Sequence, residues 1–105
     1  MNWIINYSII LKTKIMLEFG FNAGDKIAVL HSKEDNCFYI TKTNLGDNKL
    51  VLDNGNGVNM RTRNKFVAEK LGTNPLKRVY FDITQDEHDK KHNSIKCIIK
   101  KEENE

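Results

Sequence analysis

Five basic residues stand at alternating positions, just before two short segments with helical character. They are Lys12, Lys14, Arg61, Arg63 and Lys65. Residues two apart on an extended segment project to the same side, so each group directs its charges one way. A guanidinium is a planar fork that fits phosphate oxygens or a guanine edge, whereas an ammonium is a mobile point charge for phosphate. The pattern predicts a surface for a polyanion; the alternative is that these residues only solubilise the surface.

A second candidate lies in the polar stretch TQDEHDKKHNS, where His88 and His92 stand four apart. On a helical turn the two imidazoles would share a face, which is a spacing used by metal ligands. The stretch has no apolar stripe, and no third ligand is evident in the sequence. We therefore expect a solvated hairpin tip with no metal. His31 ends a strand-like segment, where we expect a packed or hydrogen-bonded side chain rather than a catalyst.

Signals for enzymatic hydrolysis are missing from the sequence. It has no nucleophile elbow, no glycine-rich loop followed by lysine and no carboxylate pair in a recognisable motif, and DNGNG is typical of a turn. We expect no catalysis, no cofactor and no small-molecule substrate. A metal-free ribonuclease, which needs only His, Lys, Arg or Glu close together in space, stays open.

Several aromatic residues stand in strand-like segments and could form a stacking surface for single strands. They are Trp3, Phe38, Tyr39, Tyr80 and Phe81. Aromatic residues in alternating strands usually belong to the core, so we expect core positions.

The composition places these residues in one small domain. The chain has 105 residues, of which 39% are hydrophobic and 30% charged, with a net charge of +3. This balance permits a polyanionic partner without requiring one. Cys37 and Cys97 lie far apart without Cys-x-x-Cys spacing, so we expect two buried thiols. The opening MNWIINYSIILKTK lacks a basic residue before its apolar run and a cleavage site after it. We expect a strand there, no membrane partner and a cytoplasmic protein.

The chain resembles itself when it is shifted by 52 positions. TKIMLEFGFNAGDKIAV, from Thr13, aligns with KFVAEKLGTNPLKRVYF, from Lys65. Ile15 and Phe19, like Val67 and Leu71, stand four apart and predict a short helix with one buried stripe. The expected caps are Thr13 and Asn64 at the helix starts and Gly20 and Gly72 at the ends, with Pro75 preventing continuation of the second helix.

Each copy has the pattern of a strand, a short helix and a β-hairpin. The first strand is INYSIIL, and its hairpin is KIAVL and CFYIT; the second copy has VNM, then KRVYFDI and IKCIIK. The predicted organisation is a first unit over residues 1–43, connecting turns with an extra strand over 44–57, a second unit over 58–100 and a frayed tail over 101–105. One unit has too little core to stand alone. Two units can bury their apolar faces against each other, as a small mixed barrel with helices over its ends and a pseudo-twofold axis.

The segment IILKTKIMLEFGFNAGDKIAVL resembles the SymE-type toxin family, a branch of the AbrB-like swapped-hairpin superfamily. The matching positions are Gly20, Phe21, Gly24, Asp25, Ile27 and Val29. The sequence departs from the family where a Trp is favoured, at Ile15, and in the second copy, where Leu76 and Lys77 replace the Gly-Asp pair. The resemblance covers about a third of the chain. It implies an α+β, β-rich fold in which two strand–short helix–β-hairpin units pack as a small AbrB-like (double-psi/swapped-hairpin) barrel.

In that superfamily the basic residues just before and within the helix are the usual DNA contacts. The resemblance carries this role to Lys12, Lys14, Arg61, Arg63 and Lys65. It implies a dimeric or pseudo-dimeric nucleic-acid-binding protein, with DNA favoured over RNA, acting as a regulator of transcription or a toxin–antitoxin component. Two alternatives stay open. One is a SymE-like toxin that acts on RNA, and the other is a non-catalytic interaction or structural module that pairs through exposed strands.

Overall fold

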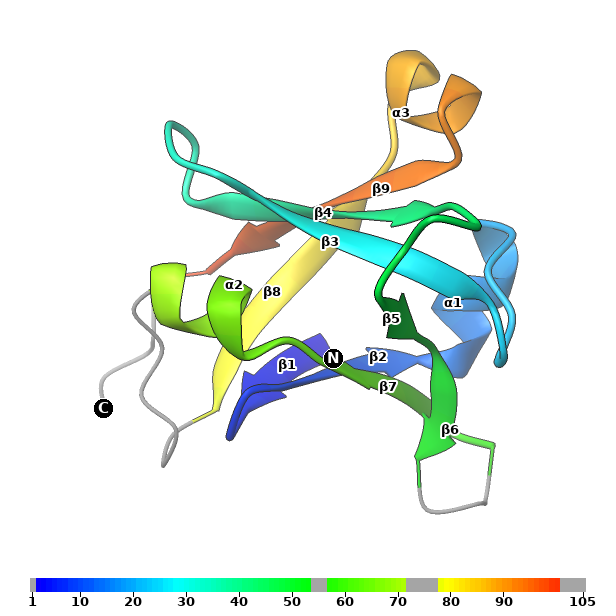
Figure 1. The fold of residues 1–105 in the computed structure, drawn as a ribbon, viewed down its shortest axis with the longest axis horizontal. Coiled ribbons are helices and arrows are strands. Elements are labelled where there is room, and N and C mark those ends of the chain that lie inside the picture. The colour runs from blue at the N-terminus through cyan, green and yellow to red at the C-terminus, as the bar shows by residue number, and fades with distance from the viewer. Residues whose placement is uncertain (1, 54–56, 72–77, 101–105) are drawn as a thin grey trace.

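The computed structural model describes residues 2–53, 57–71 and 78–100. Within them lie nine strands and three short helices (Figure 1). The strands are β1 (Asn2–Ile5), β2 (Ser8–Lys12), β3 (Lys26–Ser32), β4 (Cys37–Lys42), β5 (Asn48–Lys49), β6 (Val51–Asp53), β7 (Asn59–Arg63), β8 (Val79–Thr84) and β9 (Ser94–Ile99). The helices are α1 (Thr13–Glu18), α2 (Lys65–Lys70) and α3 (Glu87–Lys91). The fold is therefore β-rich with small helical additions, as expected.

The strands form one antiparallel sheet in the order β5-β3-β4-β9-β8-β1-β2-β7-β6. The two ends of this order are almost joined, because β5 and β6 are separated only by Leu50. β5 pairs with β3 at one end, while β6 pairs with β7 at the other. The sheet therefore curls into a nearly closed barrel, and every strand pairing in the described residues is antiparallel rather than mixed.

The order of strands is unchanged when the two halves of the chain are exchanged. The exchange replaces β1, β2, β3 and β4 by β5/β6, β7, β8 and β9. The pair β2–β7 then maps onto itself, as does β4–β9, while β1–β8 becomes β5–β3 and β1–β2 becomes β6–β7. A barrel with this pairing pattern has the strand order of a twofold-symmetric pair of units within one chain.

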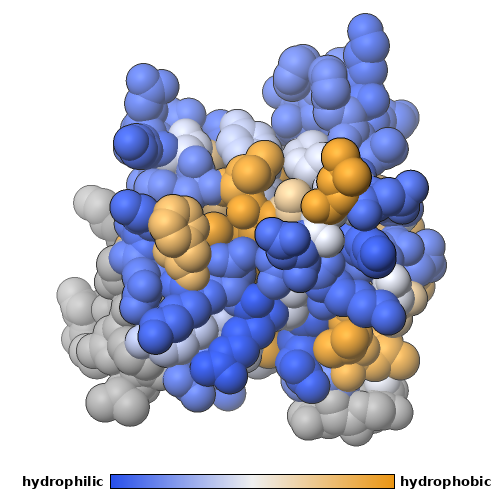
Figure 2. All heavy atoms as spheres, viewed as in Figure 1, coloured by the Kyte–Doolittle hydropathy of each residue, from blue (hydrophilic) through white to orange (hydrophobic). Residues whose placement is uncertain are grey.

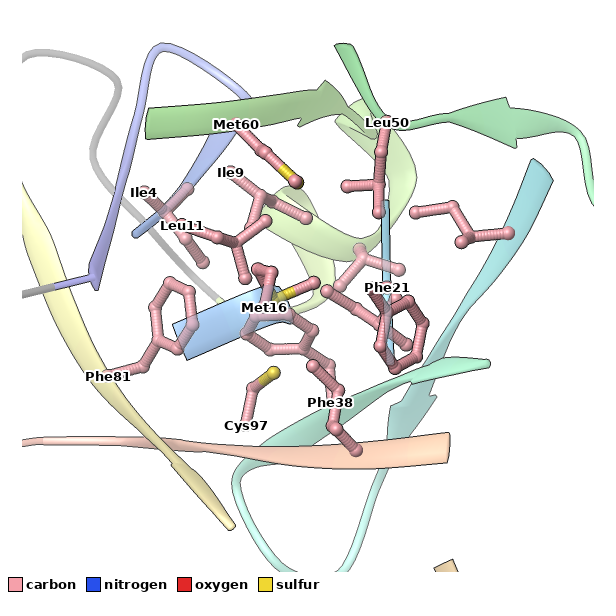
Figure 3. Close-up of a cluster of buried hydrophobic side chains, with 14 of the residues drawn as sticks. Ile4, Ile9, Leu11, Met16, Phe21, Phe38, Leu50, Met60, Phe81 and Cys97 are labelled. Atoms are coloured by element: carbon pink, nitrogen blue, oxygen red, sulfur yellow. The ribbon is translucent and has the colours of Figure 1, made fainter. Parts of the chain in front are cut away.

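Alternation along the strands places the core inside the barrel. In β2, Ile9 and Leu11 are fully buried, and in β8 Val79 and Phe81 are buried. Phe38 and Phe81 meet edge to face with ring centroids 5.1 Å apart, a favoured aromatic geometry. Met16 comes into the same cluster from α1 (Figure 3). Burying these apolar side chains is the main driving force for closing the barrel.

The expected single strand INYSIIL is wrong, because the chain turns in its middle. Asn6 and Tyr7 both have positive φ, 50° and 66°, and β1 pairs back on β2 with Ile5 opposite Ser8. Two consecutive residues of positive φ form the tight turn that matches the twist of a hairpin. The chain therefore starts with a hairpin and not with one long strand.

The solvated hairpin tip that was expected between β8 and β9 has regular structure. It holds the helix α3 instead of a plain turn. Asp86 accepts a hydrogen bond from the Asp89 N–H at 2.8 Å, and the Asp89 carboxylate accepts one from the Asp86 N–H at 3.2 Å. This reciprocal capping box satisfies two of the unpaired donors of the first turn. It lets a five-residue helix form without an apolar stripe.

The two helix starts differ, although they align in the sequence repeat. Asn64 caps α2, as expected, because its side chain accepts a 2.9 Å hydrogen bond from the Val67 N–H. Thr13 does not cap α1: the cap position is Lys12, without a side-chain bond, and the Thr13 hydroxyl is buried without a partner in the described residues. Gly20 has φ 84° after the end of α1, as expected for a left-handed cap. Gly72 and Pro75 lie outside the described residues.

Candidate nucleic-acid interface

The outer face of β8, β1, β2, β7 and β6 carries an aligned row of side chains. Tyr80 pairs with Trp3, Trp3 with Ile10, Ile10 with Arg61, and Arg61 with Val51. Their neighbours along β1, β2, β7 and β8 are buried, so the row points outward. We call this surface, with the adjoining outward residues of the same strands, the row face.

Three of the five basic residues predicted from sequence lie on the row face. Lys12 pairs with Asn59, at the start of β7, while Arg63 pairs with Ser8, at the start of β2, and Arg61 lies between them. Lys12 and Arg63 are therefore about 14 Å apart along the strands. Lys12 of the first group and Arg61 and Arg63 of the second therefore share one face, with Lys12 and Arg63 at the two ends of the β2–β7 ribbon.

The other two lie on the helices that follow. Lys14 is exposed in the first turn of α1, and Lys65 is the first residue of α2. Because β2 and β7 run antiparallel, α1 and α2 continue from opposite ends of the ribbon (Figure 1). Lys14 and Lys65 therefore stand on helices, not on the extended segments that the sequence predicted, just beyond the two ends of the β2–β7 ribbon.

Three of these cations also contact other side chains of the chain. Arg61 forms a 3.2 Å ion pair with Asp53, and its side chain is 47% exposed. Arg63 and Lys65 both lie over the Tyr7 ring, at 6.0 and 5.7 Å from its centroid. Tyr7 stands in the β1–β2 turn, and its carbonyl accepts a hydrogen bond from the Asn64 N–H. This contact fixes the turn beside the start of α2, and the aromatic ring holds two cations together.

Of the five aromatic candidates, two lie in the core and three do not, so the expectation of core positions was wrong for Trp3, Tyr39 and Tyr80. Phe38 and Phe81 are fully buried, as expected for core residues. Trp3 and Tyr80 are partly exposed neighbours on the row face, where the Arg78 guanidinium lies 4.7 Å from the centroid of the Trp3 ring. Neither Arg78 nor Tyr7 was predicted from the sequence to lie on this surface. The alternation of residues 78–83 predicts that Arg78 faces solvent. Its position beside Trp3 depends on the pairing of β1 with β8, which the alternation does not reveal.

Tyr39 lies on β4, paired with Lys96 of β9, away from the row face. Burial raises the pKa of Tyr39, and the nearby Tyr39 raises the pKa of Lys96. The Tyr39 and Lys96 side chains therefore interact across the pairing of β4 with β9.

The histidines do not form one site. His88 and His92 share a face of α3 with ring centroids 4.4 Å apart, and His92 Nδ1 lies 2.9 Å from the His88 carbonyl oxygen. His31 pairs with Phe38, which in turn pairs with Cys97, whereas α3 precedes the Ser94 end of β9. Within the described residues there is no group of three or more His, Cys, Asp or Glu side chains that could hold a metal ion.

A separate feature is a groove of about 350 Å³ between β3 and α2, lined by the apolar side chains of Leu30, Leu45 and Phe66 together with the polar residues Asp47, Asn48 and Asn64. The three apolar side chains are 54%, 91% and 65% exposed. Hydrophobic side chains gather on this face of the molecule (Figure 2). Among the described residues, positions 28–32 of β3 pair with β4 only, since β5 reaches just Lys26 and Ile27. The groove therefore borders an open strand edge.

No helix in the described parts of the chain combines the length and the apolar character that crossing a membrane requires. Comparisons with protein-family models, with curated proteins and with solved structures find no match to this chain.

Proposed function

We propose that this protein binds nucleic acid without catalysis, through the cations of the row face and of the adjoining helix starts. The residues are Lys12, Lys14, Arg61, Arg63 and Lys65. The observation that carries the proposal is the register of β2 with β7, which aligns Lys12, Arg61 and Arg63 on one outward face. Successive members are about 7 Å apart along the strands, so they can contact successive phosphates of one strand.

The charge on this face supports the proposal. Of the acidic residues on its strands, Asp53 is paired with Arg61 and Asp82 lies 3.7 Å from Lys100. The cations therefore outnumber the carboxylates there, while the chain as a whole carries only +3. A face with this imbalance attracts a polyanion by counterion release.

The resemblance to the SymE-type and AbrB-like families supports the same function. Those domains have two strand–helix–hairpin units in one barrel, and the basic residues before the helix contact DNA. On this basis we propose an AbrB-like barrel and a role as a DNA-binding regulator or toxin–antitoxin component. The separation of His31 from His88 and His92 favours binding over RNA cleavage.

A fluorescence titration with duplex DNA and with structured RNA at two salt concentrations tests the proposal. We expect binding that weakens steeply with salt, because each neutralised phosphate releases counterions. Lys12→Ala together with Arg63→Ala should weaken binding and make the salt dependence shallower by about one unit of slope for each lost contact. A chain that binds neither of these at low salt, nor a single-stranded oligonucleotide, would exclude this function.

A matched control removes the same charge elsewhere. Lys90 and Lys91 are exposed on α3, at the far end of the β8–β9 hairpin from the row face. Lys90→Ala together with Lys91→Ala lowers the net charge equally, so a general charge effect would weaken binding in both double variants. The melting temperatures of both should stay close to that of the parent chain, because exposed lysines and arginines contribute little to stability.

A second candidate function is an interaction module that pairs with a second copy of the chain through β3. The open edge over residues 28–32, beside the exposed Leu30, Leu45 and Phe66, favours it. An open strand edge can accept another strand by backbone hydrogen bonds. Sedimentation analysis should then show a dimer that Leu30→Lys disrupts, while Leu52→Lys, at a half-exposed position on β6, leaves it intact. A monomer at high concentration rules this candidate out.

A further inference from the structure

Trp3 and Tyr80 are neighbouring aromatic residues on the row face. They are directly opposite each other on β1 and β8, where Ile4 and Phe81, the next residues, are buried in the core. Both rings are partly exposed. The barrel interior is filled by other side chains, among them Phe38 and Phe81. Two aromatic side chains on the outside of a sheet are therefore a surface feature that the packing of the core does not require.

Arg78 adds a planar cation over the Trp3 ring. Its guanidinium lies 4.7 Å from the centroid of the Trp3 ring, and the Arg78 side chain is exposed. A guanidinium stacked on an indole has a second face, which can stack on a nucleic-acid base. The arrangement offers a base an aromatic and cationic platform, at a contact distance typical of cation–π pairs.

The cations proposed to bind phosphate lie on the same face as Trp3 and Arg78. The row that contains Tyr80 and Trp3 continues through Ile10 to Arg61. Ile10, which stands between Trp3 and Arg61 in the row, is only 6% exposed. Tyr7, with Arg63 and Lys65 over its ring, is a second aromatic and cationic group at the end of the ribbon.

We infer that the row face binds single-stranded nucleic acid, with a base stacked on the Arg78 guanidinium above Trp3 and the phosphates on Lys12, Arg61 and Arg63. This inference rests on the proposed function and narrows its ligand to an unpaired strand. Bases within a duplex are stacked on one another and cannot reach such a platform, whereas unpaired bases can. The combination of a cationic groove or strip with exposed rings is the usual design of single-strand binding sites.

The intrinsic fluorescence of the chain tests the inference directly, since Trp3 is its only tryptophan. The probes are a short oligothymidylate and the same strand paired with oligoadenylate. We expect the emission of Trp3 to change as oligothymidylate binds, and the duplex to bind more weakly at the same salt concentration. Equal affinity for both with unchanged emission would overturn the inference and leave the proposed function standing. Failure of both probes to bind would overturn the inference, and the titration with structured RNA would then decide whether the proposed function stands.

Variants separate stacking from charge. Arg78→Lys keeps the charge but removes the plane, so we expect about tenfold weaker binding of oligothymidylate. Trp3→Phe keeps a ring and should bind nearly as the parent does, whereas Trp3→Leu should lose about as much as Arg78→Lys. Tyr39→Leu, on β4 away from this face, is the matched control and should change nothing. Parent-like binding by Arg78→Lys, whose exposed side chain leaves the fold intact, would refute the stacking role.

Discussion

At the scale of single residues, the unequal helix starts allow a direct test of capping. Asn64→Ala removes the acceptor for the Val67 N–H and should lower the free energy of unfolding by about 1 kcal/mol. Thr13→Val replaces a buried hydroxyl that has no partner in the described residues with a methyl of similar shape, so we expect no loss or a small gain. Urea unfolding measures both. A loss for Thr13→Val equal to that of Asn64→Ala would show that the Thr13 hydroxyl is bonded after all.

The two cysteines give a second prediction at this scale. Cys37 and Cys97 are free and buried, and burial raises the pKa of the Cys97 thiol well above its usual value. Since the thiolate is the reactive form, a chromogenic thiol reagent at neutral pH should react with the folded chain no faster than the chain unfolds. Rapid reaction of either cysteine in the absence of denaturant would contradict the packing described here.

At the scale of elements, Gly46 allows the loop that precedes β5 to pack closely against the backbone of β3. A Cβ at this position would overlap the Ile27 carbonyl, which is backbone and cannot move aside without shifting β3. We expect Gly46→Ala to lower the free energy of unfolding by about 3 kcal/mol. Gly20→Ala is the control, because its Cβ meets open space and only the positive φ opposes it, at about 1 kcal/mol. Equal effects in urea unfolding would mean that the loop adapts.

The capping box of α3 gives this element a dependence on pH. The Asp89 N–H, as the largest cause, holds the pKa of Asp86 below its usual value. Because the pKa of Asp86 is lower in the folded state, the charged cap stabilises α3 at pH values above the unfolded-state pKa of about 3.9. This stabilisation is lost as the pH falls through the folded-state pKa. The amide signals of α3 in NMR spectra should shift below about pH 4. Asp86→Asn caps without titrating through this carboxylate and should shift less.

The elements also show how far the sequence could predict the structure. The alternation in 79–83, the burial of Val67 in α2 and the Asn64 cap follow from local rules, and they were predicted, whereas the burial of Ala68 in place of Leu71 was not. The turn at Asn6–Tyr7 was missed because neither residue is glycine, although asparagine tolerates positive φ. The helix α3 was missed because Asp86 and Asp89 stabilise it by reciprocal hydrogen bonds, which no hydrophobic pattern reveals.

The candidate site was predictable only in part for a related reason. The alternation of Arg61, Arg63 and Lys65 is visible along the chain, so the cations could be selected. The contact of Arg78 with Trp3 depends on the pairing of β1 with β8, which are far apart in sequence. Long-range register of this kind decides which side chains share a face, and a single sequence does not specify it locally.

At the scale of the whole molecule, each half of the chain depends on the other for its sheet. In the first half, β1 pairs with β2, and β3 pairs with β4, but no pairing in the described residues joins these two hairpins. They are joined through the second half, because β1 pairs with β8, β2 with β7, β4 with β9 and β3 with β5. Isolated hairpins are at best marginally stable in water.

A division of the chain between these halves should therefore abolish folding of each part. We expect fragments 1–46 and 47–105 to give the circular dichroism of unfolded chains when separate, because each would hold two unconnected hairpins and less than a full core. When mixed, they should regain β-structure in a concentration-dependent way, since the pairings between them are those that close the barrel. The intact chain should unfold in one cooperative step for the same reason. A stable fold in fragment 1–46 alone would mean that its hairpins associate without the second half, and the interleaved pairing would then not be what holds the barrel together.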